Sequence, residues 1–298
     1  NLLAVKVTIR FKLPSCVGLG SSGAYCVCIA TSLLCATGII PCPNAQTSCA
    51  DTLTWSDNHL EVIRRWSASA ESLIHGRASG LDAAVCTYGG ICSYKLGYPT
   101  QRLLNCPDLK VILVNSKVER STVRMVTTVK EKLKRFPAVV DCIFNSMDAI
   151  SLESVKILDK SSSTGSVCTD SANSSSSAED EKHSMTSSEP GSMMDDYSRL
   201  NELSRINNQL LIALGVGHPK IDHICTILAR YGIYPKMTGA GGGGCVFAFL
   251  KPDTPQTLVE MIHREVVASG FEMWQPMLGS DGIVLHMKRF DINVISAK

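Results

Sequence analysis

Two glycine-rich runs more than 200 residues apart constrain the fold of this chain more than any other feature. Residues 18–22 read GLGSS, and residues 236–245 read KMTGAGGGGC. A glycine-rich loop that leads into an apolar stretch leaves backbone N–H groups exposed at the start of a helix, where a phosphate group can bind. The hydroxyls of Ser21 and Ser22 can also reach phosphate oxygens or a magnesium ion. The first run therefore predicts a phosphate-binding loop.

Other glycine motifs fit this loop less well. A Walker A loop ends in Gly-Lys-Ser/Thr, which does not occur in the chain. The dinucleotide pattern G-x-G-x-x-G is present at Gly18, Gly20 and Gly23, but the acidic residue it needs about 20 positions later is missing. The first acidic residue after the loop is Asp51. A dinucleotide site and a simple turn remain alternatives.

The composition is that of a globular enzyme with room for two domains, with 298 residues, 45% apolar and 19% charged. A net charge of +2 on scattered Lys and Arg side chains gives no case for nucleic acid as a partner. The 13 cysteines are odd in number and include no Cys-x-x-Cys pair. We therefore expect reduced, mostly buried thiols and a cytoplasmic location rather than disulfides or a zinc site.

One segment has the superficial character of a membrane span. Residues 13–50 carry no charge, and residues 24–40 are largely apolar. Polar residues interrupt this stretch, and Pro41 and Pro43 follow it, so it is too short to cross a bilayer. We expect a helix buried on all sides behind the loop, and no membrane association.

Hydrophobic periodicity and chain breakers indicate an α+β fold rather than a doubly wound parallel sheet. Strands are expected over residues 5–12, 85–94, 111–114, 246–250 and 283–287, and helices over residues 23–36, 58–74, 122–136, 194–214, 219–230 and 254–268. In the second of these helices, the spacing places Leu60, Ile63, Trp66 and Leu73 on one side. Residues 161–191 contain 12 serines and few large apolar side chains, which predicts a disordered surface loop.

The motif P-x-x-x-G-L-G-S-S from Pro14 to Ser22 resembles the phosphate loop of the GHMP small-molecule kinases. Residues 70–76, 79–85, 214–218 and 236–245 narrow the resemblance to the mevalonate kinases within that superfamily, and the similarity runs from about residue 8 to about 287. The resemblance implies the two-domain GHMP kinase fold. Residues 1–107 would form part of a ribosomal-protein-S5-like N-terminal domain, and residues 108–298 an α+β sandwich.

The resemblance implies ATP-dependent phosphorylation of the 5-hydroxyl of mevalonate with Mg²⁺, an early step of isoprenoid and sterol biosynthesis. It assigns the catalytic base to Asp82 and the metal to Ser22 and Glu71. Asp82 also lies among small and apolar residues, where an idle carboxylate would be costly, although an N-cap role is an alternative. A solvated helix carboxylate is the alternative for Glu71. The implied nucleotide contacts are Pro14, Val17, Gly18, Leu19, Gly20, Ser21, Ser22, Gly239, Ala240 and Gly241, and the implied substrate contacts are Ile74, His75, Thr122 and Thr238.

The chain also departs from the resembling family. Only 13 residues precede Pro14, whereas the family's active-site lysine motif lies upstream of the phosphate loop. We therefore expect the sequence to be a fragment that lacks the N-terminal part. A phosphomevalonate, galactose or homoserine kinase, or a non-catalytic nucleotide-binding relative, remains an alternative. The resemblance leaves open whether the protein forms a homodimer.

Overall fold

The computed structural model describes residues 4–11, 13–14, 17–43, 52–76, 78–103, 106, 109–159 and 191–286, with the backbone alone at residues 75 and 191–195. The helices are α1 Ser21–Ala36, α2 Asp57–His75, α3 Leu81–Tyr88, α4 Thr122–Arg135, α5 Pro137–Leu158, α6 Gly191–Ala213, α7 Pro219–Ala229 and α8 Gln256–Ala268. The strands are β1 Thr52–Leu53, β2 Ile91–Ser93, β3 Gln101–Leu103, β4 Lys110–Asn115, β5 Lys236–Met237, β6 Cys245–Leu250, β7 Glu272–Trp274 and β8 Leu285–His286. The mixture of helices and antiparallel strands confirms the α+β class.

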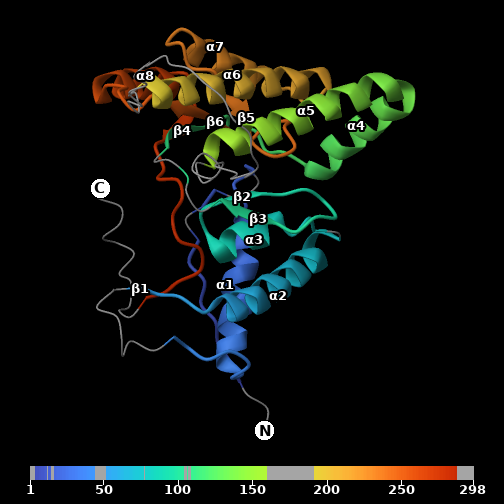
Figure 1. The fold of residues 1–298 in the computed structure, drawn as a ribbon, viewed down its shortest axis with the longest axis vertical. Helices are drawn as coiled ribbons and strands as arrows, with labels where there is room; N and C mark the ends of the chain where they lie inside the picture. The colour runs from blue at the N-terminus through green and yellow to red at the C-terminus, as the bar shows by residue number, and fades with distance from the viewer. Residues whose placement is uncertain are drawn as a thin grey trace, which may run out of the picture.

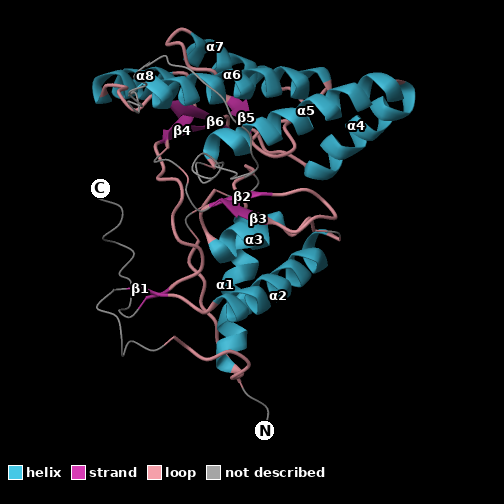
Figure 2. Ribbon diagram, in the orientation of Figure 1, coloured by secondary structure: helices cyan, strands magenta, loops and turns pink. Residues whose placement is uncertain are grey.

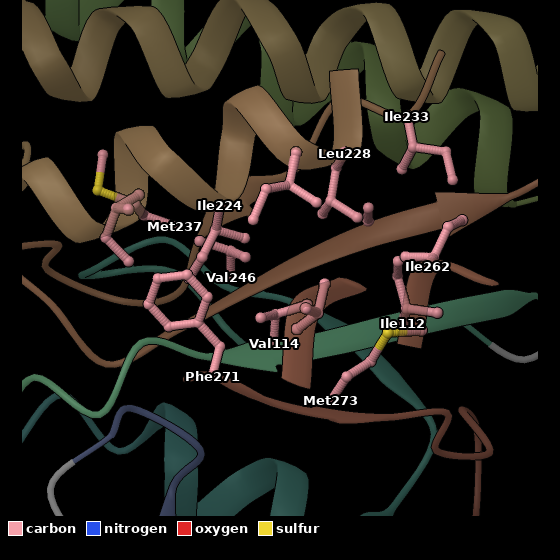
Figure 3. Close-up of a cluster of buried hydrophobic side chains, with 14 of the residues drawn as sticks. Ile112, Val114, Ile224, Leu228, Ile233, Met237, Val246, Ile262, Phe271 and Met273 are labelled. Carbon is pink, nitrogen blue, oxygen red and sulfur yellow. The ribbon is translucent and has the colours of Figure 1, made fainter. Parts of the chain in front are cut away.

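A four-stranded antiparallel sheet in the order β5-β6-β4-β7 supports one half of the molecule. Side chains alternate across a strand, so Ile112 and Val114 of β4 and Val246 of β6 face the same way. They pack against fully buried side chains of the covering helices, such as Ile224 of α7 and Ile262 of α8 (Figure 3). Figure 2 shows α6, α7 and α8 together on this side of the sheet.

Helices α1, α2 and α3 form the other half, below the sheet in Figure 1. Leu34 of α1 and Ile63 of α2 are buried in a second apolar cluster. The chain returns to this cluster near its C-terminal end, because β8 pairs with β1 and Ile283 donates its N–H to the Thr87 carbonyl over 3.1 Å. The red segment in Figure 1 follows this path from the sheet down to β1.

Two of the expected strands are wrong. Residues 85–94 were expected to be extended, but the segment begins inside α3 and only Ile91–Ser93 is a strand. Packing of α3 between α1 and α2 outweighs the β-branched and aromatic residues, and Gly89 and Gly90, both with φ near 70°, end the helix. The described residues 4–11 form no strand, since no neighbouring strand in the described chain pairs with them.

The helices also differ from expectation in which surfaces they bury. Trp66 and Leu73 are 56% and 89% exposed, whereas Leu60 and Ile63 are buried as expected. Helix α1 is buried on one side and not all round, because its Tyr25 is 41% exposed. Helix α5 was not expected at all. The serine-rich residues 161–190 lie outside the described residues, and residue 191 already belongs to α6.

The described cysteines correct one expectation. None of the ten cysteines in the described part of the chain forms a disulfide, but only Cys26 and Cys245 are buried. Cys28, Cys42 and Cys142 are exposed, so the thiols are not mostly buried. Among the helices that the structure describes, none is both long enough and apolar enough to cross a membrane.

Candidate active site

The first glycine-rich run forms a loop that opens directly onto the N-terminus of α1. Gly20 takes a left-handed conformation, with φ 71° and ψ 25°, and begins the helix without a side-chain cap. The first turn holds no acidic residue. Its N–H groups therefore have no side-chain acceptor at the loop, and the helix dipole adds partial positive charge there. The loop has the properties of an anion site.

The two glycine-rich runs lie against each other. Cys245 donates its backbone N–H to the carbonyl oxygen of Val17 over 3.0 Å, and the Thr238 hydroxyl approaches the same oxygen at 3.4 Å. A Cβ on Gly244, which has φ 73°, would lie 2.5 Å from that oxygen, so only glycine fits there. One carbonyl group of the first run is thus contacted by two residues of the second run, more than 200 positions later in the chain.

The remaining glycines of the second run are also in close contact with protein. A Cβ on Gly241 would collide with Val216, one on Gly242 with Met125, and one on Gly243 with Val118. The backbone of the second glycine-rich run therefore packs closely against neighbouring residues. The backbone N–H of Thr238 donates to the Cys245 carbonyl over 3.0 Å, so that amide is already paired within the protein.

Ser22 and Glu71 meet beside the phosphate loop. The Ser22 hydroxyl donates to Oε1 of Glu71 over 3.2 Å, although the residues are 49 positions apart. Glu71 is only 5% exposed, which rules out a freely solvated carboxylate. A hydroxyl and a carboxylate are hard oxygen ligands of the kind that Mg²⁺ prefers. The described residues contain no group of three or more metal-binding side chains, and Mg²⁺ commonly takes its other ligands from water and phosphate.

Asp82 lies at the start of α3, where that helix crosses the first turn of α1. A Cβ on Gly23 would lie 2.6 Å from the Cβ of Asp82, so the glycine permits the crossing. A Cβ on Gly20 would lie 3.5 Å from Oδ1 of Asp82, which places the carboxylate beside the loop. Burial, together with the smaller effects of the negative charges of Asp82 and Glu71, raises the pKa of the Cys86 thiol to about 12. The two carboxylates therefore act in the same region.

Arg120 joins this group, although the sequence analysis did not single it out. It lies in the connection between β4 and α4, and its Nη1 donates to the Thr238 carbonyl over 2.5 Å. Burial lowers the pKa of Arg120, while the charges of Cys245 and Asp82 oppose that shift. Its position two residues before Thr122 was the available signal.

Other predicted residues lie less centrally. Thr122 is the first residue of α4 and is exposed. Ile74 is 54% exposed in the last turn of α2, and His75 follows it, with a side chain outside the described residues. Pro14 precedes the loop and is partly exposed. No described hydrogen bond joins Pro14, Ile74 or Thr122 to Asp82 or Glu71.

Comparison with known proteins decides the family. Residues 193–268 match the family model for the C-terminal part of GHMP kinases. The chain is 36% identical to mevalonate kinase from Bos taurus over 285 residues, covering 96% of this chain and 64% of the relative. It is 31% identical to mevalonate kinase from Dictyostelium discoideum, covering 95% of this chain and 67% of that relative. The chain belongs to the mevalonate kinase family.

Solved structures of mevalonate kinases share the fold. The L. major enzyme in complex with R-mevalonate aligns with a TM-score of 0.62 at 16% identity, over 89% of this chain and 67% of that one. The Methanococcus jannaschii enzyme aligns with a TM-score of 0.56 at 20% identity, over 90% and 66%. These neighbours confirm the GHMP kinase fold. The chain spans 64–65% of the length of the mammalian mevalonate kinases it matches.

Proposed function

We propose that the protein phosphorylates the 5-hydroxyl of mevalonate with ATP as the donor. The observation that carries the proposal is the meeting of Ser22, Glu71 and Asp82 at an uncapped helix N-terminus. Phosphoryl transfer needs such a phosphate cradle, a divalent cation and a group that accepts the hydroxyl proton. The named mevalonate kinases support mevalonate as the alcohol.

Each residue has a separate part in this proposal. The first-turn N–H groups of α1 bind phosphate oxygens, and Ser22 with Glu71 would hold Mg²⁺, which neutralises phosphate charge when bound. Asp82 accepts the proton of the 5-hydroxyl as the oxygen bonds to the γ-phosphorus and the bond to the β-phosphate oxygen breaks. Ile74, His75, Thr122 and Thr238 remain proposed substrate contacts.

The test is product formation by the complete protein. ATP, MgCl₂ and mevalonate should yield ADP and 5-phosphomevalonate, followed by coupled ADP release and mass spectrometry. Galactose, homoserine and phosphomevalonate serve as competing alcohols. Faster turnover of one of these would reassign the substrate. Nucleotide binding without ADP release for any alcohol would instead support a non-catalytic relative.

We also propose the division into two domains near residue 108, with residues 280–286 returning to pack on the first. The support is the β1–β8 pairing and the packing of the partly buried Ile283 and Leu285 against the apolar cluster of α1 and α2. A cytosolic location is proposed from the absence of disulfides among the described cysteines. Sedimentation equilibrium would show a homodimer as a doubled mass.

A further inference from the structure

The guanidinium of Arg120 lies in the space between the two glycine-rich runs. A Cβ on Gly18 of the first run, or on Gly239 of the second, would overlap this guanidinium. Both glycines have positive φ, 81° and 55°, which residues with a side chain rarely adopt, and a Cβ at either position would force the guanidinium to move. One side chain thus touches the backbone of both runs.

The polar contacts of Arg120 agree with this placement. Its Nη1 donates to the Thr238 carbonyl in the second run over 2.5 Å, and Asp82 beneath the first run is the carboxylate whose charge acts on it. The side chain is partly buried, so each of these interactions is less screened than it would be in water. A planar guanidinium can reach both directions at once, whereas a lysine ammonium is a single point charge.

We propose that Arg120 is a positioning residue that braces the two glycine-rich segments against each other and keeps the phosphate loop aligned with Asp82. Arg120 affects the reaction by fixing the positions of the two glycine-rich segments, and it neither accepts nor donates the transferred phosphoryl group. The bracing is a property of the ligand-free protein, so it does not depend on which alcohol is phosphorylated.

The first test is hydrogen exchange in the complete, ligand-free protein, with Arg120→Ala, Arg120→Lys and the matched control Arg124→Ala. Arg124 lies one turn further along and is exposed. Arg120→Ala should speed exchange of peptides covering residues 17–22 and 238–245, including the Cys245 N–H bonded to Val17, by about tenfold or more. Peptides from β4 should exchange at the original rate, and Arg124→Ala should change neither set.

The second test separates positioning from simple structural support. Arg120→Ala should lower kcat/KM for ATP by about tenfold or more, because loss of a hydrogen bond to a charged donor has effects of that size. Millimolar guanidinium ion should restore part of that loss, and Arg120→Lys should restore little, because the ammonium cannot span both runs. If Arg120→Ala does not fold, Arg120→Lys carries the same comparison.

Unchanged exchange in both glycine-rich runs of Arg120→Ala, or full activity of Arg120→Lys, would overturn the bracing role. Equal effects of Arg124→Ala would overturn it too, because they would indicate general destabilisation of α4. A wild-type protein that phosphorylates no alcohol would refute the proposed function instead, and the exchange result would still decide the role of Arg120.

Discussion

Two carboxylates at the candidate site differ in their surroundings, and the difference suits different roles. Glu71 is almost fully buried and accepts a hydrogen bond from Ser22, as a metal ligand in a fixed geometry would. Asp82 lies in the first turn of α3, and its carboxylate is next to Gly20 of the loop, which has no side chain. A carboxylate in that place can reach a substrate hydroxyl when one is bound.

Replacement of Asp82 by Asn tests the base. The amide cannot accept the hydroxyl proton, so kcat should fall by about 10²- to 10⁴-fold while ATP affinity and the unfolding midpoint stay close to wild type. Steady-state kinetics and calorimetric titration with a non-hydrolysable ATP analogue measure these quantities. Asp57→Asn is a suitable control, because Asp57 also lies in a first helical turn and its side chain is 91% exposed. Near-normal turnover of Asp82→Asn would remove the residue from the mechanism.

Ser22→Ala and Glu71→Gln test the shared metal site. Each variant should raise the Mg²⁺ concentration needed for half-maximal activity, because Ser22→Ala removes one proposed oxygen ligand and Glu71→Gln removes the negative charge of the other. The double variant should lose less than the sum of the two in free energy, since both side chains would serve one ion. Mg²⁺ titrations of the wild-type protein, the two single variants and the double variant complete this double-mutant cycle. Strictly additive losses would contradict a single ion held by both residues.

A cluster of hydrogen-bonded polar side chains connects helices α2 and α3 next to the apolar core. Glu61 of α2 accepts hydrogen bonds from Arg64 and from the Tyr88 hydroxyl of α3, both over 2.7 Å. These contacts hold the pKa of Glu61 at about 2, with Arg64 the largest cause, although burial opposes the shift. The orientation of α3, and with it the position of Asp82, thus has a support outside the active site.

The pH dependence of stability should report this cluster. The pKa of Glu61 is lower in the folded than in the unfolded protein, so its stabilisation is present above about pH 4.5 and is lost as the pH falls toward 2. Glu61→Gln should therefore destabilise the protein near pH 6, and the difference from wild type should shrink below pH 4.5. Urea unfolding across this range measures it, with exposed Glu260→Gln as the control. A difference that stayed constant with pH would argue against the ionised Glu61 as its source.

For the whole molecule, the serine-rich segment offers a test of what the core requires. Replacement of residues 161–190 by a short Gly-Ser linker should leave the unfolding free energy and kcat nearly unchanged, because the segment has few apolar side chains to bury. Helix α5 ends before the replaced residues and α6 begins after them, so the linker variant keeps both helices. Ile224→Ala, at a fully buried position, should by contrast cost about 2–5 kcal/mol. A comparable loss in the linker variant would show that the segment packs on the core.

Features set by local sequence were predictable from sequence alone. Periodic apolar residues marked α4, α7 and α8 to within about two residues, and apolar runs marked the central strands β4 and β6. The GLGSS run predicted a loop at the start of a helix, because the backbone conformations that glycine and serine favour there depend on the residues themselves and not on distant contacts. The motifs that resemble mevalonate kinases led to the family without any structural information.

The tertiary structure alone decided the rest, because those features depend on which distant segments meet. Residues 85–88 are helical because α3 packs against both α1 and α2. Residues 4–11 form no strand, and no strand pairs with them among the described residues. The link between Val17 and Cys245 follows from folding of both halves together. The placement of Arg120 between Gly18 and Gly239 also follows from the tertiary structure. The sequence around a charged residue in a connecting segment does not indicate which distant residues it will contact.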